Sequence, residues 1–481
     1  MRACNLALLA GFCLVLSVTG CTVGPDFRSP EPLVPAAWAG VLAGTRPLTP
    51  AETDLARWWS VFDDPILTSL VERAVVSNLD LKQAESGVRQ ARASRGIAAS
   101  GLGPSIDAGG SFQRSRSPGF AGREGVIRGD ASTTNLYQTG FDAGWELDIF
   151  GGLRRSVEAA EADLLAAVET RRDVLVTLTA EVARNYVELR AFQQRIDIAR
   201  RNLRAQQDSA RLTRLRFEAG FASGLDVANA DAQVATTASQ IPLLEASAQQ
   251  SIYILGVLLG HEPAALLQEL SPAEDIPAAP PLAPVGIPSD LLRRRPDIRR
   301  AEAEIHGATA RIGVATADLF PKFSLTGSMG FQSSTSSSLF DWISHFWSFG
   351  PSATWRIFDT GKTLSNIELQ KALEEQSVIA YRQTVLTALQ EVENALVVST
   401  KEQEHREALK DSVVANRKAV ELARQLYVEG QTDFLSVLEA QRSLFATEDA
   451  LTQSNGTLAT NLIALYKALG GGWRTTSESE R

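Results

Sequence analysis

Residues that could support catalysis or bind a metal are few in this 481-residue chain and lie far apart. The histidines show none of the short spacings that zinc sites use, and they are His261, His306, His345 and His405. Paired acids such as Asp63-Asp64 stand directly before Pro65, where they are typical of a helix start. No phosphate-binding loop, nucleophile elbow or dinucleotide fingerprint occurs in the sequence. We therefore predict neither an enzyme nor a metal site.

The cysteines point to a different chemistry, because all three lie within the first 21 residues. Arg2 precedes a short apolar run, Leu6–Val18, which is typical of a secretory signal and too short to span a membrane. The run leads into Thr19-Gly20-Cys21, which resembles a bacterial lipobox. We therefore expect residues 1–20 to be removed and Cys21 to carry diacylglycerol and N-linked palmitate, with no other cofactor. An ordinary signal peptide that happens to contain a cysteine would look similar.

The composition is consistent with a large exported protein that does not bind nucleic acid. The formal net charge is -9 and 44% of the residues are hydrophobic, so a basic footprint for nucleic acid is absent. Thr22 follows the cysteine where an Asp would indicate inner-membrane retention, which favours the outer membrane. No later stretch is apolar enough for a membrane-spanning helix. If the protein crosses a membrane, it must do so with strands.

Four segments alternate apolar residues with small polar or charged ones. The clearest is Phe323–Phe331; the others are Phe349–Ile357, Phe141–Asp148 and a weaker, Gly-rich segment, Ile106–Arg114. A period of two suits strands with one face in lipid and the other in water. Half-buried strands of a soluble sheet would show the same alternation, but four strands of about membrane-spanning length in an exported chain favour a barrel.

Two hairpins cannot close a barrel alone, because open edges in lipid leave backbone groups unsatisfied. Two chains would give eight strands, whose interior is filled by side chains, whereas three would give twelve and leave room for a conduit. The strand count therefore predicts a homotrimer.

The chain also repeats itself with an offset of 210 residues. Trp145 matches Trp355, and Gly220 matches Gly430. Each repeat contains a run free of Gly and Pro, over 153–219 and 363–429. Such a run predicts a helix about 100 Å long at 1.5 Å per residue. Its apolar spacing suits helices packed side by side with one wet face, although a solid coiled coil would give the same pattern.

These signals predict a mainly α fold with a membrane β-barrel part. We expect a signal peptide over 1–20, a lipidated extended segment over 21–60, repeat 1 over 61–260, a Pro-rich equatorial linker over 261–288, repeat 2 over 289–470 and a tail over 471–481. In repeat 1 we expect a helix over 66–95, a hairpin about 104–148, a long helix about 153–219 and a return helix over 225–259, kinked or broken at Pro242. In repeat 2 the corresponding elements are 296–318, about 321–358, about 363–429 and 434–469. The prolines of the linker argue against a regular helix there.

Several strings carry a family resemblance. They are Cys21-Thr22-Val23-Gly24-Pro25-Asp26-Phe27, Trp58-Trp59 before Phe62-Asp63-Asp64-Pro65, the run Pro288–Ile298, and Leu469-Gly470-Gly471-Gly472-Trp473. Over essentially the whole mature chain the sequence resembles the outer-membrane efflux lipoproteins of the TolC/OprM type, also called the NodT group. The resemblance implies a trimer with a twelve-stranded barrel in the outer membrane and a twelve-helix periplasmic tunnel. The implied partners are a periplasmic adaptor protein and an inner-membrane transporter of the resistance-nodulation-division kind.

The resemblance also implies a gate where the long helices turn back. The residues that align with the family's closed aperture are Tyr427, Asp433, Leu435, Glu439 and Arg442. Leu435 would form an apolar constriction and Glu439 an acidic ring, while Arg442 and Tyr427 would bond neighbouring helices in the closed state. Alternatively, Glu439 and Arg442 are a solvated local pair on one helix, worth ~0.2–0.5 kcal/mol. Glu439 and Arg442 have no charged counterpart in repeat 1, so the charged contacts of the gate are expected in repeat 2 only.

The function that follows is passive conduction of small molecules through an outer-membrane duct that extends into the periplasm. Two alternatives remain open at the level of sequence: a duct for secreted proteins, and a structural lipoprotein whose helices merely span the periplasm. The identity of the exported substrate is not readable from these residues.

Overall fold

The computed structural model describes residues 22–31, 34–39, 55–118, 131–278 and 288–473. Its residues divide into two compact units. Unit 1 comprises residues up to Pro30, Val88–Ala166 and Ala301–Tyr381, and unit 2 comprises Glu31–Gly87, Ala167–Arg300 and Arg382–Arg481. Each unit is described by itself below. The predicted signal peptide and Cys21 lie outside the described residues, as do 279–287 of the linker and 474–481 of the tail.

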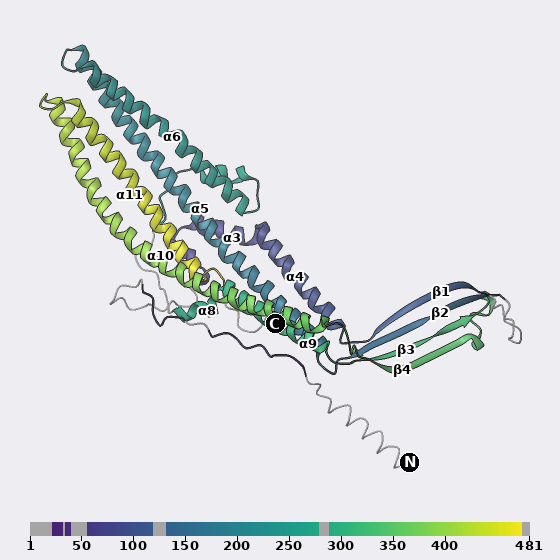
Figure 1. Ribbon diagram of the computed structural model, residues 1–481. Coiled ribbons are helices and arrows are strands. Elements are labelled where there is room, and N and C mark those ends of the chain that lie inside the picture. The colour runs from purple at the N-terminus through teal and green to yellow at the C-terminus, as the bar shows by residue number, and fades with distance from the viewer. Residues whose placement is uncertain (1–21, 32–33, 40–54, 119–130, 279–287, 474–481) are drawn as a thin grey trace, which may run out of the picture. The chain divides into compact units, whose positions relative to one another are not determined.

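Unit 1 contains one four-stranded antiparallel sheet in the order β1-β2-β3-β4, which Figure 1 shows as two neighbouring hairpins. Its strands are β1 (Ser105–Ser117), β2 (Ser132–Leu147), β3 (Lys322–Ser333) and β4 (His345–Thr354). All four predicted strands are present. The fourth, predicted over Phe349–Ile357, both begins and ends earlier than predicted, and the Trp355 indole directly after it donates its Nε1–H to the Leu319 carbonyl at 3.0 Å. Between β3 and β4 the chain forms two short turns, η4 (Ser336–Ser338) and η5 (Trp342–Ser344).

The sheet has one apolar and one polar face, as the alternation predicts. Phe141 pairs with Met329, and Met329 with Trp347, so these three side chains form a row across neighbouring strands. The side chains that alternate with these along each strand point to the opposite, polar face. On that face the hydroxyls of Ser324 and Ser352 lie 2.7 Å apart. Ser328 and Ser348 form the same contact at 2.7 Å.

The polar face also contains a close approach between β2 and β3. Gly140 pairs with Gly330, and a Cβ added to Gly330 would lie 2.2 Å from the Thr139 carbonyl oxygen. We expect Gly330→Ala to destabilise the sheet by about 1–3 kcal/mol, because the strands must separate to admit the methyl group. Infrared detection of thermal strand loss measures this. Gly109→Ala is the matched control, since Gly109 pairs with Gly140 on its other side but has open space at its Cβ; equal effects of the two changes would contradict the expectation.

The long helices are equal in length in the two repeats. α5 (Gly152–Glu218) and α10 (Lys362–Val428) each have 67 residues, and the return helices α6 (Gly224–Leu258) and α11 (Phe434–Ala468) each have 35. Pro242 was expected to kink or break α6; it does not break the helix, which continues through it. Proline removes one hydrogen bond from the helix and crowds the carbonyl four residues before it, but buried residues on both sides of Pro242 hold the helix in place, among them Thr237 and Ala248.

The helix expected over 66–95 is in fact two helices, α3 (Pro65–Ser77) and α4 (Leu79–Ser100). They part at Asn78, whose backbone is extended. The Asn78 side chain accepts from the Leu81 N–H at 2.9 Å and donates to the Leu258 carbonyl at 2.9 Å. The Asn78 side chain therefore caps the start of α4 and also bonds it to the end of α6.

The remaining helices are short, apart from α9 (Pro296–Ala317). They are η1 (Trp58–Phe62), η2 (Pro263–Leu266), α7 (Leu267–Leu270), η3 (Pro288–Asp290) and α8 (Leu291–Arg294). The expectation of no regular helix in the linker is corrected for Pro263–Leu270, where Leu266 and Leu270 are buried in the core of unit 2. Among the described helices, none alone is long and apolar enough to span a membrane. α6 and the segment Pro263–Leu270 are together long and apolar enough, but the two are bent by 112° where they meet.

Two of the characteristic strings meet in the core of unit 2. Trp58 is 1% exposed and its ring stacks on Tyr466 at 5.5 Å. The Gly472 N–H donates to the Leu55 carbonyl at 2.8 Å, which brings the glycine string across the face of Trp58. The Trp473 ring then lies under the guanidinium of Arg172, with 4.6 Å to its centroid. The string that contains Trp58 and the string that ends in Trp473 therefore pack against each other in the core of unit 2.

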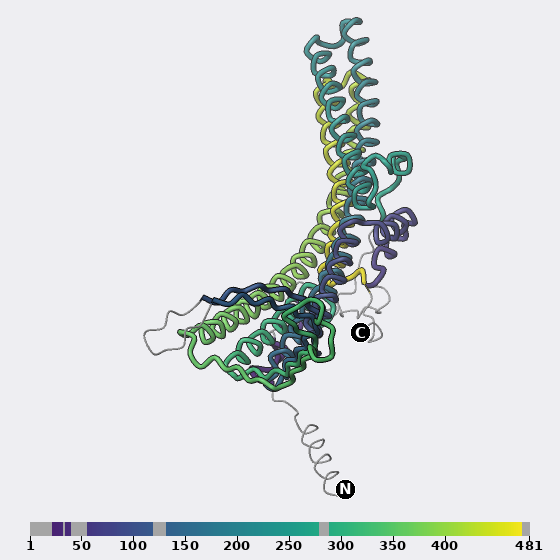
Figure 2. The backbone as a smooth tube through the Cα atoms, turned by 90° about the vertical axis from the view of Figure 1, so that its right-hand side faces the viewer, coloured from purple at the N-terminus to yellow at the C-terminus, as the bar shows by residue number. Residues whose placement is uncertain are grey.

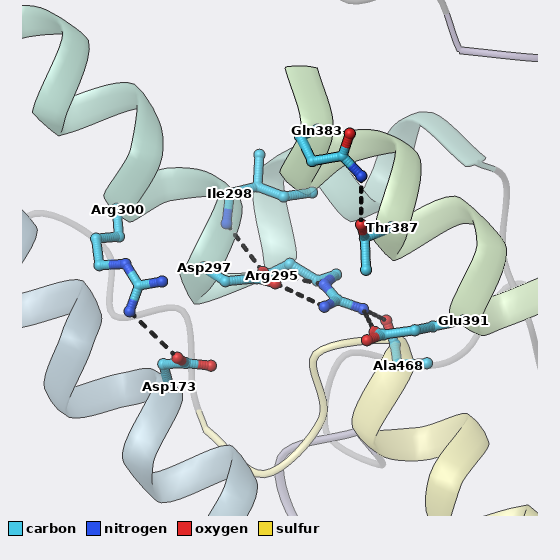
Figure 3. A network of polar contacts seen from close by, with 9 residues as sticks. All are labelled: Asp173, Arg295, Asp297, Ile298, Arg300, Gln383, Thr387, Glu391 and Ala468. Atoms are coloured by element: carbon cyan, nitrogen blue, oxygen red, sulfur yellow. Dashed lines mark hydrogen bonds and ion pairs between the residues drawn. The ribbon is translucent and has the colours of Figure 1, made fainter. Parts of the chain in front are cut away.

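A third string forms a polar network at the start of α9 (Figure 3). Arg295 donates to both carboxylate oxygens of Asp297, at 3.0 and 2.6 Å. It also donates to Glu391 at 2.5 Å and to the Ala468 carbonyl at 3.0 Å, where α11 ends. A buried guanidinium needs such partners on every side, and these join α9, α10 and α11.

Candidate periplasmic gate

The predicted gate residues lie in unit 2, around the turn between α10 and α11. Figures 1 and 2 show this turn beside the turn between α5 and α6, with the four helices running side by side up to it. Both long helices end in the same way. Gly220 and Gly430 adopt φ values of +80° and +77°, and the next residue donates back across the last turn, Phe221 to Arg216 and Gln431 to Leu426. This is the Schellman ending that glycine allows.

Asp433 begins α11 as its N-cap. Its carboxylate accepts from the Ser436 N–H at 3.2 Å and from the Ser436 hydroxyl at 2.9 Å. The Ser436 hydroxyl and N–H bonds hold the pKa of this exposed carboxyl below its ordinary value. A lowered pKa means that the carboxylate stabilises the turn at neutral pH and that this support is lost as the pH falls through the folded-state pKa. The contacts thus give Asp433 a capping role in the chain itself.

Tyr427 is buried where the two repeats meet. Its hydroxyl lies 3.3 Å from the Thr213 hydroxyl, and its ring packs against Phe434 at 5.7 Å. The Arg216 guanidinium covers the other part of the ring, 4.7 Å from the centroid. The same guanidinium donates to the carbonyls of Tyr427 and Val428, at 2.8 and 3.1 Å. A cation is favourable at the C-terminus of α10, where the last carbonyls have no partner in the helix.

Arg442 also bonds to repeat 1 rather than to its helical neighbour. Its Nε donates to the Gln233 side-chain oxygen on α6 at 2.6 Å. Among the described residues Glu439 has no ion pair with Arg442, so the alternative of a local Glu439–Arg442 pair is not realised. The preceding residue, Gln441, donates to Ser209 on α5 at 2.9 Å. Polar contacts therefore join the two repeats along the tip of unit 2.

Leu435 and Glu439 face outward. The Leu435 side chain is 49% exposed, and Glu439 is exposed on the same helix. They are four positions apart in the sequence, so both lie on one face of α11. This face makes none of the contacts described for Tyr427 and Arg442, and it is free to meet another molecule.

The sequence reasoning missed the residues of repeat 1 that hold the tip. The expectation that the charged contacts belong to repeat 2 alone is corrected, because Arg216 supplies a charge and Gln233 an acceptor from repeat 1. A signal for them was present in the repeat comparison. Arg216 matches Leu426 and Gln233 matches Ser443, so each position carries in repeat 1 a long polar side chain that repeat 2 lacks.

Comparison with known proteins decides the family. The family model described as outer membrane efflux protein matches residues 70–261 and 287–471. The chain belongs to the outer membrane efflux protein family. The resemblance inferred from the sequence strings is thus confirmed, and so is the mainly α, TolC-like fold with four strands and two long-helix repeats in each chain.

Relatives of this efflux protein cover it over almost its full length. It is 32% identical to nodulation protein T of Rhizobium leguminosarum bv. trifolii, over 97% of both chains. It is 34% identical to the toluene efflux pump outer membrane protein TtgF of Pseudomonas putida, over 96% of both. The solved outer-membrane channel OprN superposes with a TM-score of 0.87 at 38% identity, over 94% of this chain and 100% of that one. This efflux protein is an outer-membrane channel, and the predicted function and location are confirmed.

Proposed function

We propose that three copies of this efflux protein form the passive exit duct of a tripartite pump. The observation that carries the trimer is the open sheet: in the order β1-β2-β3-β4, β1 and β4 each have one neighbour within the described chain. An unpaired strand edge is not tolerated in lipid. Pairing β4 of one copy with β1 of the next satisfies both edges, and three copies give twelve strands, enough for a conduit.

The apolar sheet face supports the same assembly. Its large side chains are exposed in the single chain, Phe141 by 55%, Met329 by 62% and Trp347 by 74%. Lipid covers such a face in a membrane barrel, while the hydroxyl rows of the other face line water. Native mass spectrometry of the detergent-extracted protein tests the stoichiometry. A single species with the mass of three copies is expected, and on gels it should migrate as a monomer only after heating. A stable monomer would refute the trimer.

The proposed partners are those that the family resemblance implies for an outer-membrane channel of an efflux pump. We propose that the tip of unit 2 meets a periplasmic adaptor protein and that an inner-membrane transporter of the resistance-nodulation-division kind supplies small-molecule substrates. No catalytic step is assigned to the chain, and no cofactor beyond acyl chains on Cys21 is proposed.

A susceptibility panel of drugs and metals on a deletion strain tests this function. The deletion is expected to sensitise the strain, and deleting the transporter gene as well should sensitise it no further, because both proteins serve one pathway. Additive sensitisation would contradict the shared pathway. Loss of secretion of a protein, without sensitisation, would favour the alternative duct for polypeptides.

Leu435 and Glu439 are proposed to face the axis of the trimer and to narrow it. Their exposed position on one side of α11 supports this, because residues buried within the chain cannot line an aperture. We expect the double change Leu435→Ala and Glu439→Ala to raise single-channel conductance in planar bilayers, since it removes bulk and charge from each copy. The matched control is Leu225→Ala with Asn229→Ala, the equivalent positions of repeat 1. A conductance equal to that of the control would refute the aperture.

A further inference from the structure

The first described residues, Thr22–Ser29, lie against unit 1. The Val23 N–H donates to the Phe150 carbonyl at 3.1 Å, between the end of β2 at Leu147 and the start of α5 at Gly152. Thr22 lies against Gly151, where an added Cβ would be 2.8 Å from the Thr22 Cα. The segment therefore begins at the junction between the sheet and the long helix.

Arg155 is the main polar partner of this segment. Its side chain is 5% exposed. Its Nε donates to the Val23 carbonyl at 3.3 Å, and one terminal nitrogen donates to Asp26 at 2.6 Å. The other terminal nitrogen donates to Glu158 at 2.8 Å, which orients the guanidinium. The planar fork of arginine serves three directions at once, which a lysine ammonium cannot do in one position.

Two glycines allow the segment to pass close over α9. Gly24 has φ +91°, and a Cβ there would lie 2.5 Å from the Gly313 Cα. A Cβ on Gly313 would in turn lie 2.8 Å from the Arg155 side chain. Neither position admits alanine without moving backbone or the buried arginine, so the close passage depends on both glycines.

Contacts continue to the end of the segment. The Phe27 ring stacks on the His306 ring with centroids 4.5 Å apart and 14° between the planes. His306 in turn lies 3.0 Å from Glu158, the carboxylate that also orients Arg155. The Ser29 hydroxyl donates to Glu302 at 2.5 Å. The N-terminal string is thus docked along its length in a socket whose members are Arg155, Glu158, His306 and Gly313.

We propose that this socket positions the lipid anchor, with Arg155 as its positioning residue. The inference rests on the proposed acylation of Cys21, which is bonded directly to Thr22. No spare chain then separates the acylated residue from the junction beside Gly151, so the acyl chains enter the membrane at the level where β2 ends. A tether without slack keeps the sheet at a high effective concentration at the membrane surface, whereas a flexible linker dilutes it. Anchor and sheet therefore insert as one body.

Docking itself is tested by trypsin on the full-length acylated protein in detergent. Arg28 is an exposed cleavage site within the docked segment, and cleavage requires the segment to leave the socket. We expect Gly24→Ala and Arg155→Met each to raise the rate of cleavage after Arg28 about tenfold, because each removes close packing or charge-assisted hydrogen bonds. Gly24→Ala changes the segment alone and leaves the body of unit 1 intact.

The controls for docking keep the same residue types. Gly96→Ala adds a methyl group into open space in unit 1, and Arg311→Met removes an ion pair with Asp163 in the same unit. Both are expected to be cleaved at the wild-type rate. Wild-type cleavage of Gly24→Ala and Arg155→Met would overturn the socket.

The positioning role is tested by lengthening the tether without disturbing the socket. A short Gly-Ser linker is placed between Cys21 and Thr22, with a threonine kept directly after the cysteine. We expect Arg28 to stay protected. Assembly is followed in pulse-labelled protein by the rate at which its gel migration becomes heat-modifiable. This rate should fall to that of a Cys21→Ser chain, which is exported by a non-lipoprotein signal and carries no acyl chains. Adding Gly24→Ala to the linker chain should slow it no further, since both changes break the same connection.

Intact mass separates the two ways in which this inference can fail. A mature chain without acyl mass refutes the proposed lipidation, and the positioning with it. An acylated linker chain that assembles at the wild-type rate overturns the positioning alone and leaves the proposed lipidation standing.

Discussion

Replacing Arg295 by methionine is expected to lower the free energy of unfolding of unit 2 by about 3–5 kcal/mol, the usual cost of removing one partner from a buried ion pair. The Arg295 side chain is 10% exposed and that of Asp297 19%, so the Asp297 carboxylate would lose its cation with little access to water. The Ala468 carbonyl would also lose its donor. Burial alone would lower the pKa of Arg295, and Asp297 and Glu391 together raise it, so the charged form is strongly held.

The measurement is native-state hydrogen exchange at the last turn of α11, because the chain has two units and a single unfolding midpoint would mix them. Amides of 462–468 should exchange faster in Arg295→Met. Arg295→Lys should not restore protection, since an ammonium cannot donate to both Asp297 oxygens and to Glu391 as the guanidinium does. Arg300→Met is the matched control: its guanidinium is 36% exposed and 3.5 Å from Asp173, so a change below about 1 kcal/mol is expected. Equal exchange in the two methionine variants would refute the role of the network.

The elements that follow from local rules could be predicted. The Gly- and Pro-free run over 153–219 corresponds to α5 at Gly152–Glu218, because helix ends are set by glycine within one or two residues. The alternation of Phe323–Phe331 could be placed in a strand because side chains change faces at every residue. In both cases the signal lies within the segment itself.

Other features depend on residues distant in sequence, and no local pattern reports them. The division at Asn78 is fixed by a bond to Leu258, 180 residues further along the chain. At the tip, Arg442 was placed in the gate by resemblance, but its acceptor Gln233 comes from the other repeat. The Glu439–Arg442 spacing permits an ion pair that the structure does not form, since the i, i+3 contact is weak and Gln233 offers a buried acceptor. Spacing shows which contacts are available, while packing decides between them.

Replacing Arg216 by leucine is expected to loosen the tip of unit 2 and increase the time the channel spends open. The change copies Leu426, which occupies the equivalent position of repeat 2. It removes the donor to the Tyr427 and Val428 carbonyls and the cation over the Tyr427 ring. Hydrogen bonds from a charged donor contribute about 1.5–3 kcal/mol, which corresponds to roughly a 10–100-fold larger population of the undocked turn.

Two readouts distinguish a gating role from a general loss of stability. Single-channel recording should show a higher open probability, and hydrogen exchange should accelerate at 425–431 without a change at the Arg295 network. Arg211→Leu is the control, because Arg211 is on the same helix, is 73% exposed and forms its ion pair with Asp208, three residues away on that helix. Unchanged gating in Arg216→Leu would mean that the two repeats separate at the tip without this contact. A higher open probability would show that each copy must first release its own repeat 1 before repeat 2 can move, since the carbonyls that Arg216 holds belong to the last turn before Asp433 and Leu435.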